Sequence, residues 1–155
     1  MGEWIAKYTL GELMDRAAES YGDREALFFK GKRWSFSQFK EQTDQAAKGL
    51  IRLGVKQGDK VTLWLVNRPE WIHIMFAVAK IGAVLVPINT RFRTADLEYV
   101  VRQSDSTTLI TVDNSGPVSY LEMVQEICPE LEKSPADDLR IKKLPGLRRV
   151  IILSD

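Results

Sequence analysis

The chain has 155 residues, of which 45% are hydrophobic and 28% charged, and its formal net charge is +1. This composition predicts one globular domain, or part of one, with a core of its own; it has no basic block that would indicate a nucleic-acid partner, and no apolar run long enough to span a membrane. The single cysteine, Cys128, excludes an internal disulfide and, with no secretory leader at the start, favours the cytoplasm.

A capping box predicts the first helix. Thr9 and Glu12 stand three residues apart, so that the threonine side chain can accept from the backbone while the glutamate reaches back. The helix should run to about residue 20. Its apolar positions predict an inward face made of Leu10, Leu13, Met14 and Ala17.

A hairpin and a second helix should follow. Two short segments, Glu25–Lys30 and Lys32–Phe36, flank Gly31, which is typical of a hairpin turn. Ser35 with Gln38 forms another capping box and opens a longer helix. Its residues at spacings of three and four predict a buried stripe of Phe39, Thr43, Ala46, Leu50 and Leu53.

The centre of the chain predicts a strand, a helix and a second strand. Lys60–Val66 and Ala83–Ile88 are continuous apolar runs, typical of buried parallel strands, and a right-handed crossover should join them. The helix should begin with Pro69 in its first turn and end at Gly82. One face would carry Ile72, Met75, Phe76 and Ala79, widened by Trp71, Ile74 and Val78. A narrow, less apolar stripe would carry His73, Ala77 and Lys80.

The remainder predicts more alternating elements. Thr94 should cap a helix, Thr108–Val112 should be a buried strand, and a helix should span Val118–Cys128 after a loop. Residues 130–147 should form a surface connection to a last strand, Arg149–Leu153. The order of elements predicts an α/β fold: a mostly parallel, doubly wound sheet with flanking helices and an N-terminal β-hairpin.

Candidate chemistry is sparse. The chain lacks the glycine-rich dinucleotide motif, the P-loop and the nucleophile elbow. Arg91, Arg93 and Arg102 flank the start of one predicted helix and could contact a phosphate, although solvated arginines are commoner. His73 is expected at a helix surface or an interface, and Cys128 at a helix end is expected to be a core residue with a raised thiol pKa. From the residues alone, no catalytic group and no metal site is predicted.

Four blocks resemble the N-terminal part of the adenylate-forming acyl-CoA synthetase superfamily, and their order and spacing agree with that family from about Thr9 to Leu153. They are Trp34–Phe39 (WSFSQF), Gly54–Val61 (GVKQGDKV), Asn67–Trp71 (NRPEW) and Ala79–Asn89 (AKIGAVLVPIN). The chain departs from the family pattern in having Phe36 for tyrosine, Val66 for proline and Ile81 for alanine. Two later segments, Ile127–Leu131 and Leu144–Leu147, are most similar to fatty-acyl-CoA ligases, of a medium-chain type.

The resemblance implies an ATP-dependent fatty acid–CoA ligase that uses ATP, Mg and CoA. The family's phosphate loop, metal-binding glutamate and catalytic lysine have no matching positions here, so residues 1–155 are expected to be an inactive N-terminal fragment. Alternatives are a non-catalytic binding or regulatory module, and an aryl-acid or luciferase-like member of the superfamily. The fragment is expected to form a homodimer through Trp71, Ile74 and Val78, or through the strand at Val150–Leu153.

Overall fold

The computed structural model describes residues 8–135 and 139–154, which form two compact units. The first unit contains the described part of Met1–Gln57 together with Arg68–Ala83. The second contains Gly58–Asn67 and the described part of Val84–Asp155. Among the helices of the described residues, none combines the length and apolarity that a membrane crossing needs.

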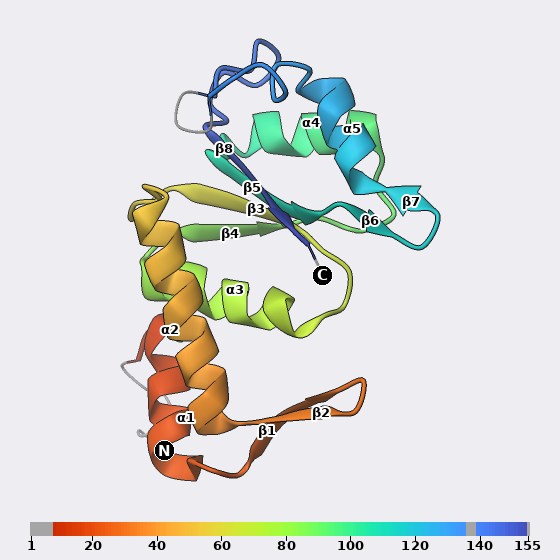
Figure 1. Cartoon of the computed structure of the whole chain (residues 1–155). Coiled ribbons are helices and arrows are strands. Elements are labelled where there is room, and N and C mark those ends of the chain that lie inside the picture. The colour runs from red at the N-terminus through yellow and green to blue at the C-terminus, as the bar shows by residue number, and fades with distance from the viewer. Residues whose placement is uncertain (1–7, 136–138, 155) are drawn as a thin grey trace, which may run out of the picture. The chain divides into compact units, whose positions relative to one another are not determined.

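The first unit consists of helices and one hairpin (Figure 1). Helix α2 contacts both α1 and α3, and the hairpin leads directly into the start of α2. The elements are the 3-10 turn η1 (Leu10–Glu12), α1 (Leu13–Tyr21), β1 (Glu25–Phe29), β2 (Lys32–Ser35), α2 (Phe36–Arg52) and α3 (Pro69–Lys80).

Local chemistry sets the element boundaries in this unit, as predicted. The Glu12 carboxylate accepts from the Thr9 backbone N–H at 2.8 Å. At the start of α2, the Ser35 N–H donates to Gln38 Oε1 at 3.0 Å and the Gln38 N–H donates to Ser35 Oγ at 3.2 Å. Both capping boxes are therefore confirmed. The hairpin is also confirmed: Lys30 and Gly31 have φ of +46° and +83°, the left-handed pair that a tight two-residue turn requires.

The predicted inward faces of the first two helices were partly wrong. Met14 is buried, but Leu10 and Leu13 are about half exposed, because the first turn is a 3-10 turn and places these side chains in a different phase. In α2 the buried residues are Phe39, Thr43, Ala47 and Leu50. Leu53 follows the helix and is 53% exposed, so the predicted stripe ran one turn too far.

Helix α3 is enclosed, as its composition predicted, but its most buried face is not the predicted one. Of the residues predicted to widen the inward face, Ile74 and Val78 are buried, but so are His73 and Ala77 of the predicted less apolar stripe. The residues predicted at the centre of the inward face are only half-buried: Ile72, Met75, Phe76 and Ala79. The His73 ring lies 4.3 Å from the Phe39 ring, centroid to centroid. His73 is therefore an interface residue between helices and not a surface histidine. A helix that is apolar on almost every side contains little information about which side packs most closely.

Lys80 of α3 forms ion pairs that connect it to the other two helices of this unit, α1 and α2. Its ammonium donates to Asp15 of α1 at 2.7 Å and pairs with Asp44 of α2. Lys40 pairs with the same two carboxylates, at 3.4 Å and 2.6 Å. Burial alone would lower the pKa of Lys80, but hydrogen bonds to Asp15 and Asp44 outweigh burial and raise it. The two lysines and two aspartates thus form a partly buried network in which no charge is left alone.

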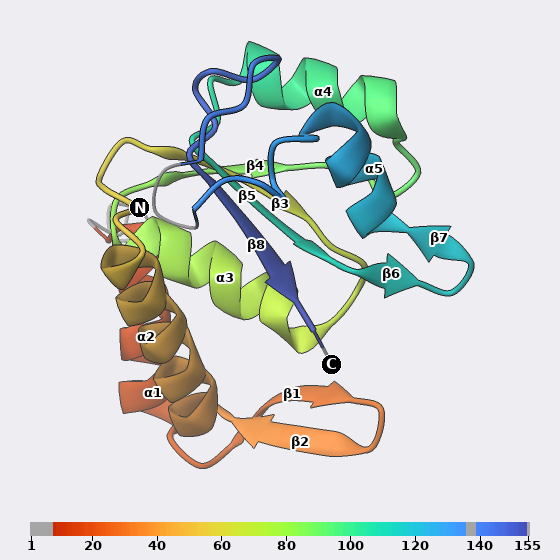
Figure 2. The same cartoon turned by 45° about the horizontal axis from the view of Figure 1, so that its top comes forward.

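The second unit is built on a four-stranded parallel sheet with the strand order β4-β3-β5-β8. Helices α4 and α5 lie on the same face of this sheet in both views (Figures 1 and 2). The strands are β3 (Lys60–Trp64), β4 (Val84–Pro87), β5 (Thr108–Val112) and β8 (Arg149–Leu153), and the helices are α4 (Thr94–Gln103) and α5 (Tyr120–Ile127). The predicted α/β fold, with a parallel sheet, flanking helices and an N-terminal hairpin, is confirmed.

Several features of this unit differ from the prediction. The N-cap of α4 is Arg93 and not Thr94, whose hydroxyl instead donates to Glu126 of α5 at 2.9 Å. The expected loop before α5 is a small hairpin, β6 (Asn114–Ser115) with β7 (Val118–Ser119), so the helix begins two residues later than predicted. The stretch at 130–147 is irregular in its described part, yet its apolar side chains Ile141, Leu144 and Leu147 are buried.

Candidate ligand-binding edge of the parallel sheet

The strand order marks one edge of the sheet as the place for a ligand. From β3 the chain passes to β4 on one side and later to β5 and β8 on the other, so the order reverses between β3 and β5. Ligands of open α/β sheets bind beyond the carboxyl ends of the strands at such a reversal. In the second unit this edge is formed by the end of β3, the segment Ile88–Arg93 after β4, and the start of α5.

Trp64, the last residue of β3, lies at the centre of this edge and is fully buried. Its indole N–H donates to the Asn89 carbonyl at 3.2 Å, and its own carbonyl accepts from the Thr111 hydroxyl at 2.8 Å. The Tyr120 ring packs edge-on against the indole with a centroid distance of 4.5 Å. Trp64 therefore joins β5, the start of α5 and the segment after β4.

Tyr120, the first residue of α5, also contacts the segment after β4. Its side chain is 3% exposed, and its hydroxyl donates to the Thr90 carbonyl at 3.3 Å. Burial raises the pKa of Tyr120, and this exceeds the opposing effects of the Arg93 charge and of the hydrogen bond to Thr90. The phenol therefore remains protonated at neutral pH and available as a donor.

The three arginines predicted to contact a phosphate have different surroundings. The Arg93 guanidinium donates through Nη1 to the carbonyls of Thr90, Arg91 and Phe92, at 3.4, 3.0 and 2.9 Å. Arg102 donates to Glu98 at 2.5 Å and to the Lys143 carbonyl at 3.2 Å. Arg91 is exposed, and within the described residues its guanidinium makes no hydrogen bond or ion pair.

Geometry separates these arginines further. Arg93 caps α4 and Arg102 lies in its last turn, nine positions later, which is about 14 Å along a helix axis. The structure therefore does not bring all three together around one phosphate. Arg91 and Arg93 share a segment, but Arg93 uses its Nη1 to hold that segment, whereas the Arg91 guanidinium makes no hydrogen bond or ion pair with the described residues. Sequence reasoning did not single out Trp64 and Tyr120, whose role depends on partners far along the chain.

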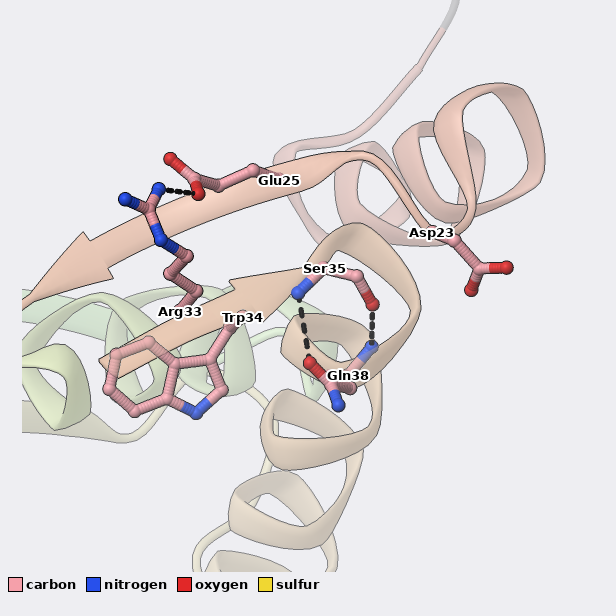
Figure 3. Close-up of a pocket in the computed structure, with 6 residues that line it drawn as sticks. All are labelled: Asp23, Glu25, Arg33, Trp34, Ser35 and Gln38. Carbon is pink, nitrogen blue, oxygen red and sulfur yellow. Dashed lines mark hydrogen bonds and ion pairs between the residues drawn. The ribbon is translucent and has the colours of Figure 1, made fainter. Parts of the chain in front are cut away.

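A hollow of about 400 Å³ lies in the first unit beside the hairpin (Figure 3). Most of its polar groups are used locally, because Glu25 pairs with Arg33 and Ser35 exchanges hydrogen bonds with Gln38. The residues that line it are Asp23, Glu25, Arg33, Trp34, Ser35 and Gln38. Its open form and internally paired charges indicate a surface groove of the hairpin, with no group arranged for a reaction.

In the described ranges, 8–135 and 139–154, no three side chains of histidine, cysteine, aspartate or glutamate gather into a group that could hold a metal ion. Cys128 is fully buried, and burial raises the pKa of its thiol to about 12, with Glu130 adding to the effect. The prediction that Cys128 is a core residue is confirmed.

Comparison with known proteins gives the family. The sequence matches the profile of the AMP-binding enzymes over residues 14–150. The chain belongs to this family. It is 37% identical over 95% of its length to the provisionally named acyl-CoA synthetase YngI of Bacillus subtilis, and 35% identical over the same share to the mitochondrial medium-chain acyl-CoA ligase ACSF2 of Mus musculus. The chain spans about a quarter of the length of these relatives, 27% and 24%.

Solved structures of AMP-binding enzymes share the fold. A protein described as a long-chain-fatty-acid CoA ligase from Archaeoglobus fulgidus is 26% identical, with a TM-score of 0.72 over 95% of this chain and 27% of its own. The N-terminal subdomain of NpsA from Klebsiella oxytoca, solved with 3-hydroxybenzoyl-AMSN, is 28% identical with a TM-score of 0.65 over 68% of this chain and 26% of its own. The resemblance found in the sequence blocks is confirmed.

Proposed function

We propose that this chain is the N-terminal portion of an ATP-dependent fatty acid–CoA ligase. In that reaction a carboxylate displaces pyrophosphate from ATP to give an acyl-adenylate, and the thiol of CoA then displaces AMP to give the thioester. The observation that carries this proposal is the family match over residues 14–150, together with relatives at 35–37% identity that are named as acyl-CoA synthetase or ligase. A medium-chain fatty acid is the substrate class that the name of the mouse relative suggests.

Within that reaction we assign no catalytic step to residues 1–155. The described residues contain no cluster of three metal-ligating side chains. Cys128 is buried with a raised thiol pKa, and His73 packs between helices, so neither is placed to act on a substrate. The remaining candidate is Arg91, whose free, exposed guanidinium lies at the ligand edge of the sheet. Guanidinium groups recognise phosphate oxygens through paired hydrogen bonds. We propose Arg91 as a contact to a phosphate group of ATP or CoA, with Arg93 and Arg102 as structural residues.

The test compares the 155-residue chain with the gene product that contains it. Both are supplied with Mg-ATP, CoA and one acid from a panel of octanoate, palmitate and benzoate, and acid-dependent pyrophosphate and acyl-CoA are measured. We expect turnover of octanoate by the larger protein and none by the chain, which should also show no micromolar ATP affinity by calorimetry. Absence of acid-dependent pyrophosphate from the larger protein would leave a non-catalytic module as the better description.

A second candidate function is an aryl-acid ligase. The likeness to NpsA favours it, because that structure contains a 3-hydroxybenzoyl compound. The same panel separates the two candidates: preference for benzoate over both fatty acids would replace the fatty-acid proposal.

We also propose that the isolated chain forms a homodimer in the cytoplasm. The contact predicted at Trp71, Ile74 and Val78 is wrong in part, because Ile74 and Val78 are buried. The edge strand β8 is the remaining candidate, since in the described residues it pairs on one side only, with β5. Light scattering at tens of micromolar protein should give the mass of a dimer, and Ile151→Lys in β8 should shift the measured mass toward that of the monomer. A monomer mass for the unaltered chain would refute the dimer.

A further inference from the structure

The segment Asn89–Phe92 has an unusual arrangement of its backbone carbonyls: each of the four accepts a hydrogen bond from a side chain, and none of these bonds belongs to a helix or a sheet ladder. The Asn89 carbonyl accepts from the Trp64 indole and from the Phe92 N–H, at 3.2 and 3.0 Å. The Thr90 carbonyl accepts from the Tyr120 hydroxyl and from Arg93. The next two carbonyls accept from the same Arg93 guanidinium.

One side-chain acceptor of the segment is occupied in the same way, because the Asn89 amide oxygen accepts from the Arg91 N–H at 2.9 Å. Just beyond the segment, Asp96 accepts from the Arg93 N–H at 3.0 Å. With its carbonyls and this amide oxygen occupied, the segment has few acceptors left to repel an anion, while the Arg91 guanidinium has no partner among the described residues. A surface that offers donors and few competing acceptors is suited to an anion.

We infer that Trp64 and Tyr120 are positioning residues, which hold the segment Asn89–Phe92 in the one conformation that presents Arg91 to a phosphate-bearing ligand. Both come from outside the segment, both are buried, and they meet at the reversal of the strand order. This inference rests on the proposed role of Arg91. It adds that the affinity of Arg91 for phosphate depends on two residues that never touch the ligand.

Preorganisation is the physical reason for the dependence. A flexible segment must lose conformational freedom when it binds, whereas a segment that is already fixed does not. Tyr120→Phe tests this most cleanly, because the ring still packs on Trp64 while the Thr90 carbonyl retains only the 3.4 Å contact to Arg93. Trp64→Phe would disturb the core as well, because the indole is fully buried.

The experiment follows the 155-residue chain by NMR. Exchange of the Phe92 amide, which donates to the Asn89 carbonyl, reports the order of the segment, and titration with inorganic pyrophosphate reports phosphate affinity. Loss of one neutral hydrogen bond predicts about fivefold faster Phe92 exchange and about threefold to tenfold weaker pyrophosphate binding in Tyr120→Phe. The matched control is Tyr99→Phe on α4, where the side chain is 64% exposed and both readouts should stay unchanged.

Arg91→Ala separates this inference from the proposal on which it rests. It should weaken pyrophosphate binding and leave Phe92 exchange as it is, whereas Tyr120→Phe should change both. Unchanged Phe92 exchange in Tyr120→Phe would overturn the positioning role, whatever Arg91 binds. If Arg91→Ala leaves the affinity for pyrophosphate unchanged, the assignment of Arg91 as a phosphate contact is wrong, and so is the link between the segment and a phosphate ligand. The rate of Phe92 amide exchange in Tyr120→Phe would then still show whether Tyr120 holds the segment.

Discussion

Gly11→Ala should destabilise the first unit, because the glycine allows η1 to lie against the end of α3. A Cβ added at Gly11 would lie 2.8 Å from Lys80 Cα and 2.9 Å from the Ala79 carbonyl oxygen. Ordinary carbon contacts are about 3.5–4.0 Å, so η1 would have to move by roughly 1 Å. Both neighbours are backbone atoms of a helix and cannot swing away. Overpacking of this kind costs about 1–3 kcal/mol, and the lower entropy of alanine in the unfolded chain returns about 0.4–1 kcal/mol.

The net expectation is a loss of about 1–2 kcal/mol, measured from urea unfolding followed by far-UV circular dichroism. Gly49→Ala is the matched control, since Gly49 lies within α2 and its added Cβ would meet nothing within 4 Å. Alanine is the better helix former by about 0.8–1 kcal/mol, so Gly49→Ala should stabilise. The same chemical change should therefore have opposite signs at the two positions. A Gly11→Ala midpoint equal to or above that of the parent chain would refute the close approach.

Three further outcomes are expected. Gly82 has φ +70° and its Cβ would lie 3.0 Å from Gln57 Cγ, so Gly82→Val should lower the free energy of unfolding by about 1–3 kcal/mol in the same assay. Burial lowers the pKa of His73 below its ordinary 6.5, against a smaller opposing effect of Glu70. As the pH falls, His73 is therefore protonated in the unfolded chain before it is protonated in the folded chain. The contribution of His73 to the free energy of unfolding should be complete above pH 6.5 and be lost as the pH falls through the lower pKa of the folded chain; His73→Gln should reduce this dependence of stability on pH. Cys128 should resist iodoacetamide at pH 8 until urea unfolds the chain, and modification of the folded chain would contradict its burial.

The parts of the fold that sequence predicted well depend on neighbours a few residues away. Capping boxes at Thr9 and Ser35 place both members three residues apart, so the sequence contains the whole interaction. The Gly31 turn and the Gly82 helix end are equally local, because each needs only a residue that tolerates positive φ. Continuous apolar runs likewise identified the central strands, since a strand covered on both faces leaves no polar alternation.

The parts that sequence missed depend on which distant surface a side chain meets. His73 of α3 is buried beside the Phe39 ring of α2, and no spacing within α3 encodes that partner. The half-exposed Leu10 and Leu13 are the opposite case, in which apolar residues lack the distant partner that would bury them. Their apolar character predicted burial, but the described residues of the first unit do not cover them.

The candidate ligand-binding edge contains one short segment in which some contacts are local in sequence and others are made by distant residues. Arg91 and Arg93 are two positions apart and looked equivalent, because a guanidinium before a helix start can bind an anion or cap the chain's own carbonyls. What separates them is the use of their donors: Arg93 is committed to three carbonyls, while Arg91 is not. One of those carbonyls, that of Thr90, also accepts from Tyr120, and the neighbouring Asn89 carbonyl accepts from Trp64; these donors lie 30 and 25 positions from their acceptors in the sequence. The different surroundings of the two arginines therefore depend on hydrogen bonds between residues far apart in the sequence.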